Sequence, residues 1–156
     1  MVTFPLGNIA CQKRDENQPF IHKREPQLKT DVNYTNKPEY AVGLLPVKPL
    51  KTGQPSQVTV HLASKGAYHV NTEYPLSFIP NTTQGLHFNK KRIALLNSMK
   101  TTPCANTPQF ICEIQAPIPF KAFQNTKLSG VLAFSVCTDE QCLIRKTPLS
   151  VEVQVK

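Results

Sequence analysis

Two segments near the C-terminus of this 156-residue chain alternate between large apolar side chains and smaller or polar ones. In GVLAFSVC, residues 130–137, the side chains of Leu132, Phe134 and Val136 fall on one face of an extended chain. In PLSVEVQV, residues 148–155, four aliphatic side chains do the same. A period of two residues is typical of a β-strand that buries one face, so we expect the chain to end in two paired strands.

Shorter segments with the same period occur earlier in the chain. The clearest is SQVTVHLASKG, in which Val58, Val60 and Leu62 share a face, and further strand candidates are AYHVN, LSFI, GLHF and QFICEIQAPI. The segment RIALLNSM is short enough to be either a strand or one turn of helix. With 14 prolines, 8 phenylalanines and no helical repeats between the strand candidates, the sequence predicts an all-β fold, an immunoglobulin-like antiparallel β-sandwich.

The pattern divides the chain into an N-terminal tail, residues 1–39, and a single domain, residues 40–156. Residues 12–38 are polar and show no regular period, which is typical of a tether or a loosely packed arm. The opening stretch MVTFPLGNIAC is apolar and ends in Cys11. It is either the remnant of a lipoprotein signal, whose cysteine would be lipidated, or part of a loose tail that contains a cysteine.

The chain is basic, since 18 Lys and Arg against 10 Asp and Glu give a net charge of +8. Such a surplus is compatible with nucleic acid, an anionic membrane or an acidic protein as partner. The basic residues are scattered, however, apart from short clusters at 13–14 and 90–92, and no aromatic residues alternate with them. We therefore expect a solvated basic surface and no nucleic-acid partner.

Five cysteines in a chain of this size, none in a Cys-x-x-Cys pair, indicate an oxidising compartment in which disulfides persist. Cys137 and Cys142 flank the polar connection TDEQ between two expected strands, and cysteines beside a hairpin turn can reach disulfide distance. Because Leu132, Phe134 and Val136 take the core face, the alternation predicts that Cys137 lies near the surface.

A bridge between these two cysteines closes a very small loop, and a disulfide stabilises a fold less as its loop shrinks. A closely spaced, exposed pair can instead open and re-form without unfolding the domain, as thiol–disulfide exchange requires. The spacing alone leaves both interpretations open: a redox-active pair, or an inert hairpin disulfide.

Cys104 and Cys112 flank the turn-rich segment ANTPQFI. We expect them to form a second, structural disulfide, with two free thiols as the alternative. The cysteine spacing does not match the paired ligands of a tetrahedral zinc site. The histidines are not clustered, and we interpret each as a surface or strand-face residue: His22, His61, His69 and His87. The sequence contains no hydrolase motif or phosphate-binding loop and predicts neither a metal site nor a cofactor.

The residues of the strand-rich region carry a resemblance to a known family. An alternating strand runs into KGAYHV, residues 65–70, an apolar strand leads to Cys137, and Cys142 is followed by a strand of alternating valines. In these features the stretch from Val58 to Val155, about two thirds of the chain, resembles the N-terminal periplasmic domain of the DsbD-type thiol:disulfide interchange proteins.

The resemblance implies an immunoglobulin-like domain in which Cys137 and Cys142 form the redox-active centre. Such a domain receives electrons from a membrane-embedded protein and passes them to thioredoxin-fold proteins of the periplasm, and Cys142 would be the cysteine that meets the partner. The family also covers its cysteines with a cap loop, to which NSMKTTPC, residues 97–104, corresponds here. This chain departs from the family in the shorter connection between its two cysteines.

The sequence therefore predicts an exported, periplasmic domain that exchanges a Cys137–Cys142 disulfide with partner proteins during disulfide reduction. We expect a monomer whose partners are thioredoxin-fold or membrane-embedded redox proteins, and whose membrane contact is a lipid on Cys11. As an enzyme it would be of the protein-disulfide reductase type. The alternative is a non-catalytic immunoglobulin-like binding or structural module with inert disulfides.

Overall fold

The computed structural model describes residues 34–156, which form eleven β-strands and no helix. The strands are β1 (Thr35–Asn36), β2 (Tyr40–Leu44), β3 (Pro55–Ser64), β4 (His69–Val70), β5 (Ser77–Pro80), β6 (Leu86–His87), β7 (Ile93–Ala94), β8 (Lys100–Pro103), β9 (Ile111–Ala122), β10 (Thr126–Cys137) and β11 (Cys142–Val153). Within this range no helix has the length and hydrophobicity that a membrane crossing requires. The predictions for Cys11 and His22 fall outside the described residues.

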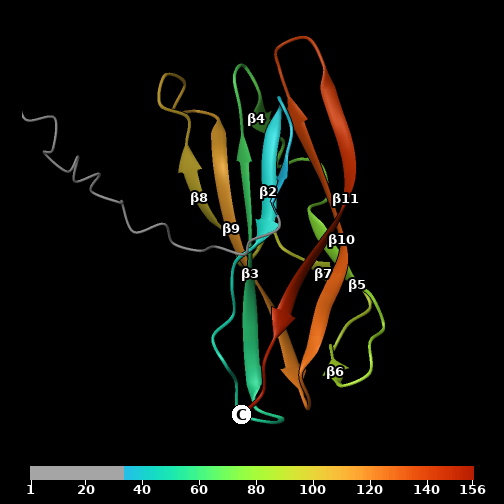
Figure 1. The fold of residues 1–156 in the computed structure, drawn as a ribbon. Helices are drawn as coiled ribbons and strands as arrows, with labels where there is room; N and C mark the ends of the chain where they lie inside the picture. Colours follow the sequence, from blue (N-terminus) through green and yellow to red (C-terminus); the bar gives the residue numbers. More distant parts are fainter. Residues whose placement is uncertain (1–33) are drawn as a thin grey trace, which may run out of the picture.

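The strands pair into one continuous antiparallel network that folds into two layers (Figure 1). One layer contains β2, β3, β9 and β8, and the other contains β10, β11, β5 and β7. The short strand β4 connects the layers, because Val70 pairs both with Ile111 of β9 and with Val136 of β10. The all-β expectation is therefore confirmed, and the architecture is an immunoglobulin-like antiparallel β-sandwich.

The core between the layers consists of the alternating apolar side chains that the sequence pattern identifies. On β3, the side chains of Val58, Val60 and Leu62 are fully buried. On β10, in the other layer, Leu132 and Phe134 are fully buried as well. Each such side chain stabilises the fold by roughly 1.5–3 kcal/mol relative to an exposed position. The period of two residues is thus explained by one face of each strand packing against the opposite layer.

The chain ends in the long hairpin that the sequence predicts. β10 and β11 pair in unbroken register from Thr126 with Val153 to Cys137 with Cys142. The turn of this hairpin lies at the same end of the sandwich as β4 (Figure 1). The two cysteines are therefore placed at the last rung of a ladder that the rest of the hairpin holds in register.

Two local features were open or different in the sequence interpretation. In RIALLNSM, Ile93 and Ala94 form the two-residue strand β7, which pairs with β5, and a turn follows. Within the described residues, Thr35 and Asn36 form the short strand β1, which pairs with β2. Strands of two residues are defined by the strands with which they pair, and a local pattern does not reveal them.

Candidate functional site

The β10–β11 hairpin holds Cys137 and Cys142 directly opposite each other. Their Cα atoms are 4.0 Å apart and their sulfur atoms are joined in a disulfide. The adjoining turn is closed by the backbone N–H of Thr138, which donates to the carbonyl of Gln141 over 2.8 Å. The Thr138 hydroxyl also accepts hydrogen bonds from the N–H groups of Glu140 and Gln141, at 3.3 and 3.2 Å. Strand alternation and a threonine-stabilised turn thus suffice to bring the two sulfurs together.

The two cysteines of this bridge differ in exposure. Cys137 is buried, with 5% of its surface accessible, whereas Cys142 is exposed. The expectation that Cys137 lies near the surface is therefore wrong. Cys137 does lie on the strand face opposite Val136, but that face is covered as well, since Ala133 and Ser135 on it are also buried. Alternation assigns a residue to a face and does not show what covers that face.

A cleft of about 440 Å³ opens beside the disulfide. Its walls are the end of β4, the loop of residues 71–73, the start of β9 and the hairpin turn. The loop is attached to β10 by the backbone N–H of Asn71, which donates to the carbonyl of Ser135 over 2.9 Å. Residues 97–104, which the sequence resemblance suggested as a cap loop, do not line this cleft. The segment that lies beside the cysteines is instead 71–73.

The charged groups of the cleft are two carboxylates and one imidazole. Glu73 and Asp139 line it, and His69 is the one lining side chain that can carry a positive charge. At the hairpin turn, the side-chain amide of Gln141 donates to the hydroxyl of Tyr68 over 3.0 Å. This hydrogen bond ties the turn to the segment that leads into β4 and fixes one rim of the cleft.

His69 is packed against an aromatic ring from the opposite wall. The imidazole stacks on Phe110, with ring centroids 4.0 Å apart and planes at 12°. The sequence pattern does not identify His69 as a site residue, because its place beside the cleft depends on the pairing of the two-residue strand β4 with β10. The local sequence shows only that His69 lies beside Val70 in a short alternating segment.

The expected Cys104–Cys112 disulfide is present in the structure, with Cα atoms 4.8 Å apart. It joins the end of β8 to the start of β9 and closes the loop that carries Phe110. Cys104 is buried and Cys112 is half-buried. The hydroxyl of Ser64 donates to the backbone carbonyl of Cys112 over 3.1 Å. This second bridge is therefore embedded in strand pairing on both sides.

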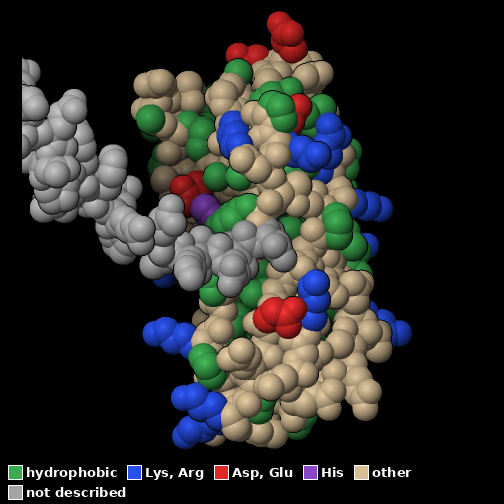
Figure 2. All heavy atoms as spheres, in the orientation of Figure 1, with side chains coloured by type: hydrophobic (Ala, Val, Ile, Leu, Met, Phe, Trp, Pro, Cys, Tyr) green, Lys and Arg blue, Asp and Glu red, His purple; other side chains and the backbone are tan. Residues whose placement is uncertain are grey.

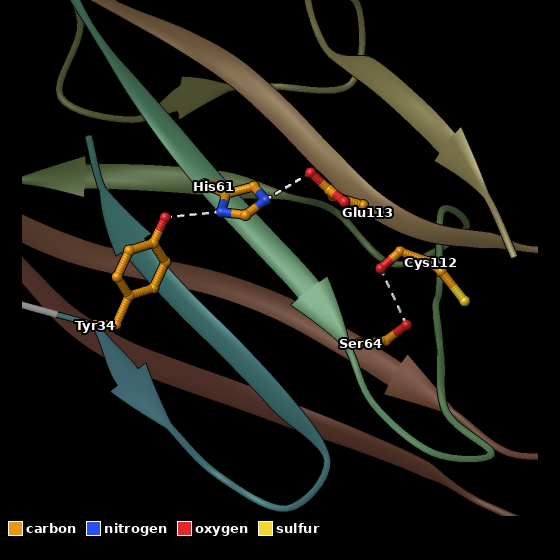
Figure 3. Close-up of polar contacts among 5 residues, drawn as sticks. All are labelled: Tyr34, His61, Ser64, Cys112 and Glu113. Carbon is orange, nitrogen blue, oxygen red and sulfur yellow. Dashed lines mark hydrogen bonds and ion pairs between the residues drawn. The ribbon is translucent and has the colours of Figure 1, made fainter. Parts of the chain in front are cut away.

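A polar cluster that the sequence did not predict lies on the outer surface of β3 and β9 (Figure 3). The hydroxyl of Tyr34 lies 2.8 Å from Nδ1 of His61, and Nε2 of the same ring lies 2.7 Å from a carboxylate oxygen of Glu113. A neutral imidazole with its proton on Nε2 satisfies both contacts, since it donates to Glu113 and accepts from Tyr34. The cluster attaches Tyr34, which precedes β1, to the sheet.

The surroundings of the Tyr34 hydroxyl change its pKa. Burial, and secondly the negative charge of Glu113, raise the pKa of Tyr34 above its ordinary value. The residue is still 37% exposed, and Tyr34, His61 and Glu113 line none of the clefts of residues 34–156 described here. We interpret the cluster as a structural attachment of Tyr34 to the sheet.

The distribution of charge differs between the ends of the molecule. Figure 2 shows Lys and Arg side chains scattered over the face in view, with acidic side chains at the end where Figure 1 places the β10–β11 hairpin. Asp139 and Glu140 of the hairpin turn are both exposed. The tip of the hairpin beside the disulfide therefore carries two acidic side chains, although the chain has a net charge of +8.

No group of three or more metal-ligating side chains is found in residues 34–156. Of the histidines in this range, His87 is exposed on β6, and His61 and His69 make the contacts described above.

Comparison with known proteins does not assign the chain to a family. No protein-family model and no curated protein matches it. Among solved structures, it is similar to AggA, the major subunit of aggregative adherence fimbriae type I from Escherichia coli, with 10% identity and a TM-score of 0.39 over 78% of this chain and 97% of that one. It is also similar to PapD-like domain 7 of human CEP192, with 9% identity and a TM-score of 0.30 over 78% of this chain and 91% of that one. Similarities this distant carry no inference about function.

Proposed function

We propose that this domain is a thiol–disulfide exchange protein whose working group is the Cys137–Cys142 bridge. The observation that carries the proposal is the asymmetry of the bridge: an exposed Cys142 is bonded to a buried Cys137 at the side of an open cleft. Exchange begins when a thiolate attacks a disulfide sulfur, so one accessible sulfur with room beside it is the basic requirement.

The bridge contributes little that the hairpin does not already have. The chain-entropy relation gives about 2 kcal/mol for a loop this small, and a ladder already in register reduces that further. A disulfide that is dispensable for the fold can open and close without changing the fold. This property favours exchange over a purely structural role.

In the proposed reaction, a partner thiolate attacks the sulfur of Cys142. The Cys137–Cys142 bond breaks, its electron pair passes to Cys137, and a mixed disulfide joins Cys142 to the partner. A second partner thiol then attacks the partner's own sulfur in the mixed disulfide, which releases Cys142 as a thiol. The partner dithiol is thereby oxidised to a disulfide and the domain is reduced, and the reverse sequence passes the electrons on.

The partners we propose are exported thioredoxin-fold proteins and a membrane-embedded electron donor, as the resemblance to DsbD-type domains implies. Two disulfides within residues 34–156 are consistent with an oxidising compartment such as the periplasm. The acidic turn at Asp139 and Glu140 would favour partners with a basic or neutral rim around the reactive cysteine.

The test is the reduction potential of each bridge in a Cys11→Ser background, titrated against a thiol buffer while the fold is followed by circular dichroism. We expect the Cys137–Cys142 bridge to have a potential above about −300 mV and to be reduced in the folded protein. The Cys104–Cys112 bridge is the internal control, and we expect it to be reduced at a lower potential.

Single-cysteine variants identify the attacked sulfur. In Cys137→Ser the exposed Cys142 thiol should react with a disulfide reagent at least about tenfold faster than the buried Cys137 thiol does in Cys142→Ser, because attack requires access. If the bridge resists reduction until the domain unfolds, the proposal is wrong, and the alternative of an inert binding or structural module holds.

A further inference from the structure

His69, Cys137 and Cys142 occupy one row across three strands. Cys137 is the register partner of His69 on β4 and of Cys142 on β11. Register partners point to the same face of a sheet, with Cβ atoms about 4.5–5.5 Å apart. All three residues also line the same cleft. The side chain of His69 therefore extends into the cleft from the strand next to Cys137, on the side away from Cys142.

The position of the imidazole is set by Phe110, on which it stacks at 4.0 Å. The backbone N–H of Phe110 donates to the carbonyl of Thr107, and its carbonyl accepts from the N–H of Cys104, both over 2.9 Å. The Cys104–Cys112 disulfide closes the loop that these bonds organise. The second bridge thus supports the ring that holds His69 at the edge of the cleft.

When the bridge opens, Cys137 leaves as a thiolate that has to be stabilised or protonated. The sulfur that leaves as a thiolate belongs to a residue that is 95% buried, and burial disfavours a charged thiolate. Glu73 and Asp139 line the cleft and disfavour it further by like charge. The hydroxyl of Ser135, 3.8 Å from the sulfur, can offer one hydrogen bond. The Cys137 thiolate therefore also requires a group that can donate a proton to it.

We infer that His69 supplies and removes the proton of Cys137 during the exchange; this inference rests on the proposed function. When a partner thiolate attacks Cys142, the electron pair of the broken bond passes to Cys137, and the imidazolium of His69 transfers a ring proton to that sulfur. Cys137 is left as a neutral thiol and His69 as a neutral imidazole.

In the opposite direction the same groups act in reverse. The neutral imidazole of His69 takes the proton of the Cys137 thiol, and the resulting thiolate attacks Cys142 in the mixed disulfide. The bond between Cys142 and the partner breaks, and the electron pair leaves with the partner's thiolate. The titratable groups that face the imidazole are Glu73, Asp139 and the Tyr68 hydroxyl, which line the clefts on its two sides.

The first experiment follows reduction of the bridge by dithiothreitol in stopped flow, with the full chain carrying Cys11→Ser. Rate constants are divided by the concentration of attacking thiolate, so that only the titration of the protein remains. In the parent protein we expect the corrected rate to fall as the pH rises, because a general acid is active only while it holds its proton. His69→Gln should lose this dependence and react about tenfold more slowly at the acidic end.

Control variants separate proton transfer from general effects of charge and packing. His87→Gln removes an exposed histidine on β6 and should leave the profile unchanged. Glu73→Gln should shift the profile along the pH axis without abolishing it. Phe110→Leu retains the imidazole but removes the stacked ring, and should give an intermediate rate if the orientation of His69 matters.

A second measurement does not depend on exchange. In Cys142→Ser with Cys11→Ser, the ultraviolet absorbance of the Cys137 thiolate is titrated, and adding His69→Leu should raise the pKa of Cys137, since a ring N–H that can donate to the thiolate is lost. If the bridge is reducible but neither the rate profile of His69→Gln nor the titration of His69→Leu differs from the parent, the inference is wrong and the proposed function stands. If the parent bridge cannot be reduced in the folded protein, both are wrong.

Discussion

Tyr34 shows how a single residue can link stability to pH. In the unfolded chain its hydroxyl ionises near pH 10, whereas in the folded protein burial and Glu113 raise its pKa. Between these two values the folded state binds more protons than the unfolded state, so the free energy of unfolding falls as the pH rises. The contribution is fully present below about pH 10 and is lost as the pH rises through the folded pKa.

We expect Tyr34→Phe to flatten this alkaline decline. At neutral pH the variant should lose about 0.5–1.5 kcal/mol, because the hydrogen bond to His61 is gone. Urea unfolding at about pH 7 and above pH 10 measures both effects, and Tyr74→Phe controls for removal of a tyrosine hydroxyl elsewhere. Equal alkaline slopes in the parent and Tyr34→Phe would contradict the assignment.

At this scale the sequence identified the cysteines but not their surroundings. The pairing of Cys137 with Cys142 follows from a short connection between two alternating strands, which is local information. The burial of Cys137 and the neighbourhood of His69 follow from the pairing of β4 with β10. That pairing joins segments far apart in the chain, and two residues of strand carry too little pattern to predict it.

At the scale of the element, β10 depends on a glycine in its middle. A Cβ atom at Gly130 would lie 2.6 Å from the carbonyl oxygen of Ile79 and would also collide with the ring of Phe78. Both belong to β5, which pairs with β10 at this point. The glycine therefore allows β5 to approach the hairpin closely.

We expect Gly130→Ala to lower the free energy of unfolding by about 1–3 kcal/mol, since overpacking displaces the β5 backbone. Gly66→Ala is the matched control, because no atom lies within 4 Å of its Cβ position and only its φ of 60° is unfavourable. That control should cost about 1–2 kcal/mol from backbone strain alone. Denaturant unfolding compares the two, and a neutral Gly130→Ala would show that β5 can move away freely.

The strands themselves were largely predictable because one face of each packs on the core. The runs around Val58 and Val151 carry a period of two and became β3 and β11. The segment at Ile93 had no such period, and its two-residue strand exists only because it pairs with β5. A period of two residues indicates that one face of a strand is buried. It does not identify a short strand that forms only because it pairs with a neighbouring strand.

On the scale of the whole molecule, two disulfides share one end of the sandwich and are expected to matter unequally for stability. Opening Cys137–Cys142 alone should lower the free energy of unfolding by about 2 kcal/mol or less, whereas opening Cys104–Cys112 should cost about 2–3 kcal/mol, because its loop is longer.

Urea unfolding in a thiol buffer that opens only the first bridge, and then in one that opens both, measures the two costs separately. If the first step removed most of the stability, the Cys137–Cys142 bridge would be a structural element and not an exchanging group.

The place of the first bridge at the last rung of the hairpin has a consequence for recognition. All other register pairs of β10 and β11 lie on one side of it, so the ladder from Thr126 to Val136 keeps its hydrogen bonds whether the sulfurs are bonded or not. The oxidised and reduced domains would then present nearly the same outline to the surroundings. A partner would have to distinguish the two redox states by direct contact with the sulfur atoms and the rim of the cleft, since the overall shape of the domain would be nearly the same in both.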